Sequence, residues 1–497
     1  MRYHTSMNTG KIISTQRREV RKGTQRKISG IGQRVSAVTL AVAMLALGAC
    51  ATRGNPPAPA PGMPGAWTEP GAPDAAAPAP DWWRSFGSVE LSGLIDAALS
   101  ASPDMAIAAE HVRQAEAQVR IAGATLFPAL NFSAATARRE SRPQGGTWSG
   151  DDSASAALSA SYEIDLWGRN ASGVRAAESS LRATRFDQQT IRLTLVAGVA
   201  SAYFQVLSLR GRLVIARENL AIAERVFKVV DARARNGAVS ALDVARQQAA
   251  VLAQRAAIPP LELQERQTLF ALAILAGRQP EGFDAAASTL SAVLVPRIAP
   301  GIPAGLLVRR PDLASAEAQL AAANANVAAA RAALLPGISL TGSAGLASDV
   351  LVNFLSAPTA TLAVGASLLQ PIFDGGRLSA QVDVAASRER ELVENYRKFI
   401  LAALADVESA LAAGSRSVDQ QVLQELILVQ ARRALRLAEV RYREGADDLL
   451  TVLDAQRTLF QAEDQLAQIR LSRLLASVGL FKALGGGWTD PDRMSPG

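Results

Sequence analysis

The sequence predicts a mixed α and β membrane protein made of two tandem copies of one unit, each copy contributing two membrane-spanning strands and long helices. Three observations predict this fold class. They are a repeat at a constant offset, segments in which apolar and small polar residues alternate, and Pro-free stretches too long for ordinary globular helices. The chain has 497 residues, of which 49% are hydrophobic but only 5% aromatic. Such a composition is typical of long packed helices.

The repeat is visible at four landmarks that are each separated by 208 residues. The pairs are Pro103 and Pro311, Pro128 and Pro336, Arg169 and Arg377, and Gly237 and Gly445. Four independent landmarks without drift indicate an internal duplication. We therefore divide the ordered part of the chain into a first repeat at 81–300 and a second repeat at 301–485, followed by a C-terminal tail at 486–497.

Two segments in each repeat alternate with a period of two residues. They cover 130–135 and 155–164 in the first repeat, and 338–344 and 361–368 in the second. Leu, Ile, Val, Phe or Ala face one way, and mostly Ser, Thr, Gly or Asn face the other. About ten residues with this pattern are typical of transmembrane β-strands. A soluble hairpin with one buried face gives the same pattern and remains an alternative at this point.

Long helices follow each pair of predicted strands. No Pro occurs from Gly168 to Ile258 or from Arg377 to Asp490, and each stretch is broken once, at Gly237 or Gly445. The helix before each break would have about 65 residues and a length of about 100 Å. A helix of this length needs partners along its whole surface, as in a coiled-coil assembly or an intramolecular bundle.

Residues 1–49 read as a lipoprotein signal peptide, with basic residues followed by the apolar run 36–47 and small residues. The sequence Leu47-Gly48-Ala49-Cys50 resembles a bacterial lipobox, in which the Cys is acylated and becomes the first mature residue. A buried structural role for this single Cys is the alternative. Residues 50–80 then form the lipidated Cys and a Pro- and Ala-rich tether. Ala51, in place of Asp, is compatible with sorting to the outer membrane.

The net charge and the composition exclude several functions. The formal charge is +7, but residues 1–49 carry nine Lys or Arg and one Glu, so the mature chain has a charge of −1. That charge argues against a nucleic-acid partner. One Cys and two His exclude a disulfide framework and argue against a zinc site, and no cofactor is predicted. No phosphate loop or nucleophile motif suggests an enzyme.

Four transmembrane strands per chain cannot close a barrel, and open edges would leave unpaired amides in lipid. Two chains would supply eight strands and three chains twelve. The positions predicted to face the lumen are mostly Ser, Ala, Thr and Gly, which are too small to fill an interior, so an open twelve-stranded barrel is favoured. This count alone does not distinguish a trimer from a dimer.

Four blocks of this sequence resemble the bacterial outer-membrane factors of the TolC/NodT type. They are WWRSFG at 82–87, the segment 306–345 containing RRPD, LLQPIFDGGRLSAQVDVA at 368–385 and RYREGADDLLTVLDAQRTLF at 441–460. The resemblance runs from the lipobox to about Leu484. It implies a homotrimer in which a twelve-stranded outer-membrane β-barrel continues into a long periplasmic α-helical barrel.

The resemblance also implies partners and functional residues. The protein would be the exit duct of a tripartite efflux or export system, passing small molecules such as drugs from a periplasmic membrane-fusion adaptor and an inner-membrane pump of the resistance-nodulation-division type. Gly237 and Gly445 would be the periplasmic tips where the adaptor docks. Asp447 and Asp448 would form a periplasmic gate with Arg443, although solvated turn acids are the alternative.

Two further expectations complete the interpretation. Gly168, Gly375 and Gly376 are expected at the turns that lead from strand to helix. A periplasmic coiled-coil adaptor lipoprotein is the alternative function, because it would share the lipidated Cys50 and the long antiparallel helices. It would lack lipid-facing hairpins and near-identical halves. Neither reading identifies the transported cargo.

Overall fold

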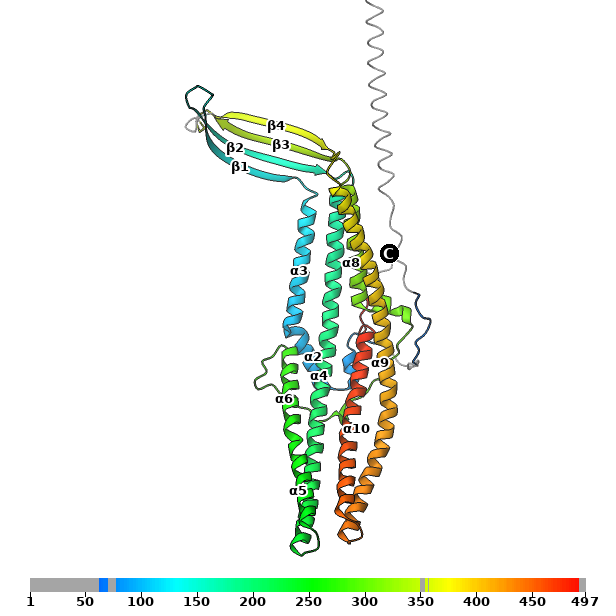
Figure 1. The fold of residues 1–497 in the computed structure, drawn as a ribbon. Coiled ribbons are helices and arrows are strands. Elements are labelled where there is room, and N and C mark those ends of the chain that lie inside the picture. Colours follow the sequence, from blue (N-terminus) through cyan, green and yellow to red (C-terminus); the bar gives the residue numbers. More distant parts are fainter. Residues whose placement is uncertain (1–61, 70–76, 349–353, 356, 491–497) are drawn as a thin grey trace, which may run out of the picture.

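The computed structural model describes residues 62–69, 77–348, 354–355 and 357–490, and it shows an open four-stranded sheet at one end of a layer of long helices (Figure 1). The first repeat comprises η1 (Trp82–Phe86), α2 (Val89–Ala101), α3 (Pro103–Ala124), β1 (Ala129–Ser141), β2 (Ser149–Ile164), α4 (Arg169–Arg235), α5 (Ala241–Ala256) and α6 (Ile258–Leu275). After η2 (Leu290–Ala292) and η3 (Pro303–Gly305), the second repeat comprises α7 (Leu306–Arg309), α8 (Pro311–Ala332), β3 (Gly337–Ser348), β4 (Thr359–Leu369), α9 (Arg377–Arg443) and α10 (Leu449–Ala483).

The sheet has the order β1-β2-β3-β4, and all neighbours are antiparallel. Phe132 is paired with Leu158, Leu158 with Ala344, and Ala344 with Leu362, so the apolar positions of all four strands share one face. The single-layered sheet leaves both faces uncovered in one chain, and Leu362 is 80% exposed. The predicted strands and their alternation are confirmed, and β1 and β4 are edge strands of this sheet.

The two longest helices, α4 and α9, have 67 residues each, which confirms the expected length of about 65. Each begins at a Gly in the left-handed region, Gly168 with φ 70° and Gly376 with φ 83°. A carboxylate satisfies the first N–H groups of each helix. Asp165 accepts from the backbone of 170 and 171, and Asp374 accepts from that of 376 and 378. An anion at this end of a helix is favoured by the helix dipole.

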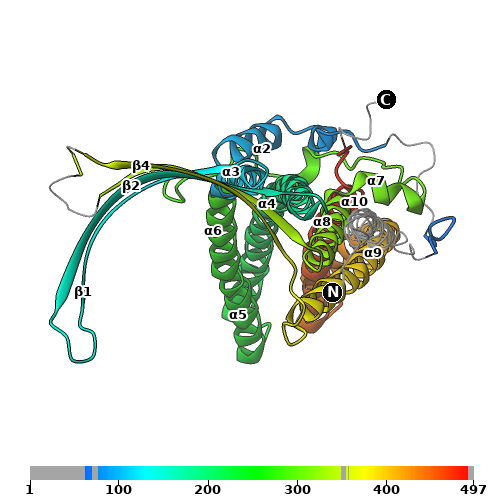
Figure 2. The same ribbon diagram turned by 90° about the horizontal axis from the view of Figure 1, so that it is seen from above.

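The helices form a layer with open sides that continues the edges of the sheet. Next to the sheet the order across the layer is α3, α4, α8 and α9, and toward the far end it is α5 with α6, α4, α10 and α9 (Figures 1 and 2). The helix α3 leads directly into the edge strand β1, and the edge strand β4 leads directly into α9. One side of the chain is therefore β1 with α3, α5 and α6, and the other side is β4 with α9.

The main apolar core lies halfway along the helical layer. Aromatic side chains of η1 meet those of α4 and α10, with Trp82 stacked on Phe481 at 4.7 Å between centroids and Phe86 against Phe204 at 5.0 Å. The same core buries the middle of α4, the only described helix apolar enough over 18 residues to cross a membrane. Because half of that window is buried in the core, packing explains its hydrophobicity.

The two repeats differ in the helix that returns from the tip. In the second repeat α10 runs unbroken over 35 residues, whereas in the first repeat a break at Ala257 separates α5 from α6. Pro259 and Pro260 occupy the first turn of α6, where a missing N–H costs little. The Pro-free stretch noted in the sequence ends at Ile258, close to the end of α5, and α6 was not predicted.

Three consecutive glycines after α10 hold the end of the chain against the N-terminal segment. Gly485, Gly486 and Gly487 all have positive φ, from 59° to 85°. A Cβ at Gly485 would lie 1.8 Å from the carbonyl oxygen of Arg309, and one at Gly487 would lie 2.3 Å from the backbone of Ala79. Both the backbone conformation and the lack of space therefore require Gly here.

We expect Gly485→Ala to lower the midpoint of thermal unfolding much more than Gly445→Ala. Gly445 also has positive φ, 77°, but no atom lies within 4 Å of its Cβ position, so Ala there costs only the left-handed strain of about 1–2 kcal/mol. At Gly485 the same strain is combined with a backbone clash. Circular dichroism melts of the two purified variants test this difference, and equal shifts would contradict it.

Candidate functional site

The free ends of the two helical hairpins have the same turn. In the first hairpin Ala238 N–H donates to Arg233 O at 2.9 Å and Gly237 N–H donates to Ala234 O at 2.9 Å. In the second hairpin the corresponding bonds from 446 to 441 and from 445 to 442 measure 2.8 and 3.1 Å. This is the Schellman arrangement, which places a left-handed residue just after the helix. Both predicted tip residues, Gly237 and Gly445, occupy that position.

The helix that leaves each turn is capped by a polar side chain. Ser240 accepts from the N–H of Asp243 at 3.2 Å, and the Asp243 carboxylate accepts in return from Ser240 N–H, which forms a capping box for α5. Asp448 caps α10 by accepting from Thr451 N–H at 3.0 Å and from the Thr451 hydroxyl at 2.8 Å. These bonds lower the pKa of Asp448, so it is a carboxylate at neutral pH.

Asp447 forms a two-point ion pair with Arg441 of the preceding helix. The distances are 2.6 Å from Nε to Oδ2 and 3.0 Å from Nη2 to Oδ1. Hydrogen bonding to Arg441 lowers the pKa of Asp447, so the pair persists below the usual titration range of Asp and is lost only in stronger acid. This ion pair with Arg441 was not predicted from the sequence. Among the described residues Arg443 forms no ion pair within its own chain, and its place in a gate between chains stays a prediction.

A second arginine joins the two repeats at the tips. Arg233 of α4 lies with its guanidinium carbon 4.7 Å from the centre of the Tyr442 ring and also donates to the Tyr442 carbonyl. Tyr442 is 4% exposed, and its hydroxyl has no hydrogen-bond partner among the described residues. Burial raises the pKa of this hydroxyl. The contact is a cation–π interaction that holds the first hairpin against the second.

The repeat offset shows how the two tips have diverged. Arg233 and Arg441 are 208 residues apart and so occupy equivalent positions. Arg233 contacts the second hairpin, whereas Arg441 contacts the turn of its own hairpin. Val239 occupies the position of Asp447. Each chain therefore presents one acid at this position, and a ring of chains would present one carboxylate per chain.

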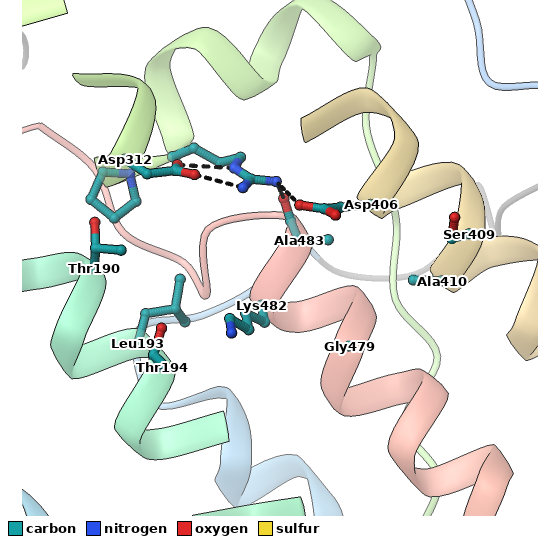
Figure 3. Close-up of a pocket in the computed structure, with 12 residues that line it drawn as sticks. Thr190, Leu193, Thr194, Asp312, Asp406, Ser409, Ala410, Gly479, Lys482 and Ala483 are labelled. Carbon is teal, nitrogen blue, oxygen red and sulfur yellow. Dashed lines mark hydrogen bonds and ion pairs between the residues drawn. The ribbon is translucent and has the colours of Figure 1, made fainter. Parts of the chain in front are cut away.

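The RRPD block forms a polar joint far from the tips. Arg310 donates to Asp312 at 2.6 and 3.0 Å, to Asp406 of α9 at 3.0 Å and to the carbonyl of Ala483 at 3.4 Å (Figure 3). Burial alone would lower the pKa of Arg310, but the hydrogen bonds and charges of the two aspartates raise it. A cavity of about 320 Å³ adjoins this joint, with Thr190 and Lys482 in its lining. The joint ties α8, α9 and the end of α10 together.

The remaining predicted residues are placed as follows. Gly168 and Gly376 cap the two long helices, and Gly375 precedes Gly376 with φ 66°. Cys50 lies outside the described residues. Within the described ranges no cluster of three His, Cys, Asp or Glu side chains could hold a metal ion. The capping carboxylates Asp165 and Asp374 were missed, although each lies two or three residues before a Gly-Arg pair.

Comparison with known proteins shows the family. The profile described as outer membrane efflux protein matches residues 94–278 and 302–486, two ranges that are themselves 208 residues apart. The pyoverdine export outer membrane protein OpmQ of Pseudomonas aeruginosa is 44% identical over 91% of this chain and 97% of its own length. ArpC of Pseudomonas putida, an antibiotic efflux pump outer membrane protein, is 33% identical over 91% and 96%. The chain belongs to the outer membrane efflux protein family.

Solved channels have the same fold. The outer-membrane channel OprN superposes with a TM-score of 0.80 at 27% identity, covering 88% of this chain and 99% of OprN. The open state of the Neisseria gonorrhoeae MtrE channel gives 0.79 at 29% identity, covering 87% and 98%. The predicted fold class, outer-membrane location and role as an efflux channel are thereby confirmed. A periplasmic adaptor would have neither a membrane sheet nor matching halves. This chain has a four-stranded sheet with an apolar face, and the family profile matches each of its halves.

We expect Tyr442→Phe to leave the midpoint of thermal unfolding unchanged or slightly higher, because the hydroxyl it removes is buried without a partner. Tyr442→Ala removes the whole ring from between the hairpins and should destabilise the protein by about 3–5 kcal/mol. Thermal unfolding of both variants in detergent measures the difference. A loss with Phe as large as the loss with Ala would show that the hydroxyl carries the contact.

Proposed function

We propose that three copies of this chain close a twelve-stranded barrel and a continuous helical tunnel, which serves as the exit duct of a tripartite small-molecule efflux system. A periplasmic adaptor would dock at the tips and an inner-membrane pump of the resistance-nodulation-division type would supply the cargo. The observation that carries the proposal is the pair of open sides on one chain. No catalytic step is part of this function.

The open sheet edges supply the first argument. The outer backbone groups of β1 and β4 have no partner strand in the described chain. In the hydrocarbon of a membrane each unsatisfied group costs several kcal/mol. Pairing β1 of one copy with β4 of the next satisfies both edges at once, and repetition of this contact closes a ring.

Apolar side chains on the two sides of the helical layer supply the second argument. Large apolar side chains are exposed on both sides, among them Leu242, Leu252 and Leu263 on α5 and α6, and Val440, Val429 and Val418 on α9. Counted from Gly237 and Gly445, three pairs lie at the same number of residues to within one, Leu242 with Val440, Leu252 with Val429 and Leu263 with Val418. Because a helix rises by about 1.5 Å per residue, the members of each pair lie at about the same level. The two sides therefore complement each other between copies.

The size of the inward-facing side chains favours three copies over two. Ser133, Ser159, Ser343 and Ser367 point to the face opposite the apolar one, together with mainly Ala, Gly and Thr. An eight-stranded barrel has an interior that side chains fill, whereas small side chains leave a larger barrel open. An open lumen is what an export duct requires.

We expect the double variant Phe127→Cys with Phe373→Cys to give a covalent ladder that ends at three chains when treated with a short bis-maleimide. Phe127 precedes β1 and Phe373 follows β4, both at the junction of sheet and helices, and they are 71% and 92% exposed in one chain. Each single variant is the control and should give at most a dimer. A ladder that ends at two chains, or no ladder, would contradict the trimer. Denaturing gels provide the readout.

We also propose that the second-repeat turns form the periplasmic gate, with Asp447, Asp448 and Arg443 of each chain around the three-fold axis. Support comes from the Arg441–Asp447 pair, which holds the turn compact, and from the exposure of Asp448. Identical carboxylates brought to one axis make a constriction that favours cations. With Val239 in the first repeat, the ring would have three acids at the Asp447 position.

We expect Asp447→Ala to raise the closed-state conductance in planar bilayers and to lower the preference for cations, because it releases Arg441 and removes three charges from the axis. Asp231→Ala is the matched control, because Asp231 lies near the first-repeat tip and pairs with Arg235 on its own helix. Unchanged conductance of the Asp447 variant would remove the gate assignment.

Cys50 is proposed to carry the lipid anchor in the outer membrane. The support is its position after the apolar run and the lack of any other Cys in the sequence. A lipid anchor contributes about 0.8 kcal/mol to the free energy of membrane binding for each buried methylene, but it does not form a pore. We expect Cys50→Ser to abolish incorporation of radiolabelled palmitate, while intact labelling of that variant would refute the lipobox. The variant should still form a folded channel, which conductance measures.

The relatives bear on the cargo class. Two relatives that are 44% identical are named for pyoverdine export, and relatives at 33% include proteins named for antibiotic, toluene or solvent efflux. Export of small molecules is common to these names. We therefore assign this chain small molecules as its cargo and place the selection among them in the pump and the adaptor.

A further inference from the structure

A groove opens in the helical layer where α4 passes between α6 and α10. Its volume is about 530 Å³. The longer polar side chains that line it are Gln205 and Arg212 of α4, Gln264 and Gln267 of α6, and Gln468 of α10. Small-molecule sites in proteins measure about 300–1,000 Å³. The groove therefore has room for a small molecule, and we call it the glutamine groove.

The glutamine groove faces the concave side of the layer. Tyr203 of α4 points the other way, because its hydroxyl is hydrogen-bonded to Ser88 at 3.1 Å and to Glu90 at 3.0 Å, at the start of α2. At about 100° per residue, Gln205 and Arg212 lie about 180–200° around α4 from Tyr203. Seen from above, α2 lies on the convex side of the arc formed by the sheet and the helices (Figure 2). A ring of copies has its axis on the concave side, so the groove faces the inside of the proposed tunnel.

The lining of the groove offers no uncompensated charge. Arg212 is the one charged residue among the described residues that line it. Its Nε and Nη2 donate to the two oxygens of Asp464 at 2.6 and 3.3 Å, and Gln468 donates to the same carboxylate at 2.5 Å. An anion would have to compete with Asp464 for the guanidinium, and no carboxylate in this lining attracts a cation. Uncharged polar groups are therefore favoured over ions.

Three amide side chains in the groove are available to a ligand. Gln205, Gln264 and Gln267 form no side-chain hydrogen bond with another described residue. Ser208, the most buried polar residue of the lining, is 3% exposed, and its hydroxyl has no partner among the described residues. A side-chain amide carries two donor hydrogens and an acceptor oxygen. A ligand amide beside it donates and accepts at once, so it replaces both of the bonds that water makes there.

We propose that the glutamine groove binds small molecules with several uncharged amide groups as they pass through the duct. This inference rests on the proposed trimer, which places one groove of each chain on the tunnel wall. The amides of α4 and α6 lie on two neighbouring helices, so one ligand contacts both. Binding is weak, because a duct must release what it holds. The groove adds a local preference to the selection made by the pump and the adaptor.

The test is binding of N-acetyltriglycine amide, an uncharged probe, to the purified full chain in detergent. Titration of the saturation-transfer NMR signals of the probe gives the Kd. The triple variant Gln205→Leu, Gln264→Leu and Gln267→Leu keeps the side-chain length and removes the three amides. We expect it to raise the Kd at least tenfold, as the loss of two or more hydrogen bonds implies. An unchanged Kd, or no binding by the unaltered protein, would overturn the proposal.

A matched triple variant controls for glutamine in general. Gln248, Gln461 and Gln465 are exposed and lie outside the groove, so their replacement by Leu should leave the Kd unchanged. A rise equal to that of the groove variant would overturn the site. Circular dichroism checks that both variants are folded.

A charged form of the probe controls for the ligand class. N-acetyltriglycine has the same peptide groups and ends in a carboxylate. It should bind no more tightly than the amide, because Asp464 already occupies Arg212. Binding at least tenfold tighter would assign the groove to anions and overturn the uncharged class.

Conductance in planar bilayers tests the position on the tunnel wall. Ser472 is exposed in the groove, and Ser100 is exposed on α2 at the convex side. A polyethylene glycol chain attached to Ser472→Cys should lower the conductance by about half, whereas the same chain on Ser100→Cys should leave it unchanged. Equal effects would overturn the wall position. The groove is built within one chain, so failure of the trimer would leave probe binding intact, and loss of probe binding would leave the trimer intact.

Discussion

Unpaired backbone hydrogen-bonding groups on β1 and β4 are the constraint on which the rest of the structure depends. A four-stranded sheet with an apolar face is not a stable structure in lipid by itself, because its two edges remain unsatisfied. The chain extends the same two open sides along its helices, from β1 into α3 and from β4 into α9. One contact between copies therefore closes the barrel and the tunnel together. Closure also gives α9, which lies at one open side, a second neighbour along its 67 residues, as a helix of this length requires.

The two repeats share one frame, and several of the side-chain contacts described above lie where the repeats differ. Val239 in the first repeat stands where Asp447 stands in the second, and Ser102 stands where Arg310 joins α8, α9 and α10. The break at Ala257 has no counterpart in α10. Such differences distinguish the two hairpins of one chain. The cation–π contact of Arg233 with Tyr442 then connects two hairpins that are no longer equivalent.

Local patterns predicted the repeats, the four strands and the two 67-residue helices, because each is encoded by periodicity or spacing within one segment. The contacts that depend on how helices face one another were not predictable in this way. The ion pair between Arg441 and Asp447 was not predicted from the sequence, because it depends on how the turn places Asp447 against the end of α9. The Arg310 joint combines three helices that are distant in sequence, and the docking of Trp67 on Gly301 spans 234 residues. The helix α6 was not predicted because the helical pattern was followed only through the Pro-free stretch to Ile258, although Pro259 and Pro260 also suit the first turn of a helix.

The most direct test of edge closure is the mass of the intact assembly. Native mass spectrometry of the protein, released from detergent micelles, counts the chains that share one barrel without any engineered residue. We expect one dominant species with the mass of three processed chains. A dominant single chain or a closed pair would contradict it, because neither provides the twelve strands that an open lumen requires.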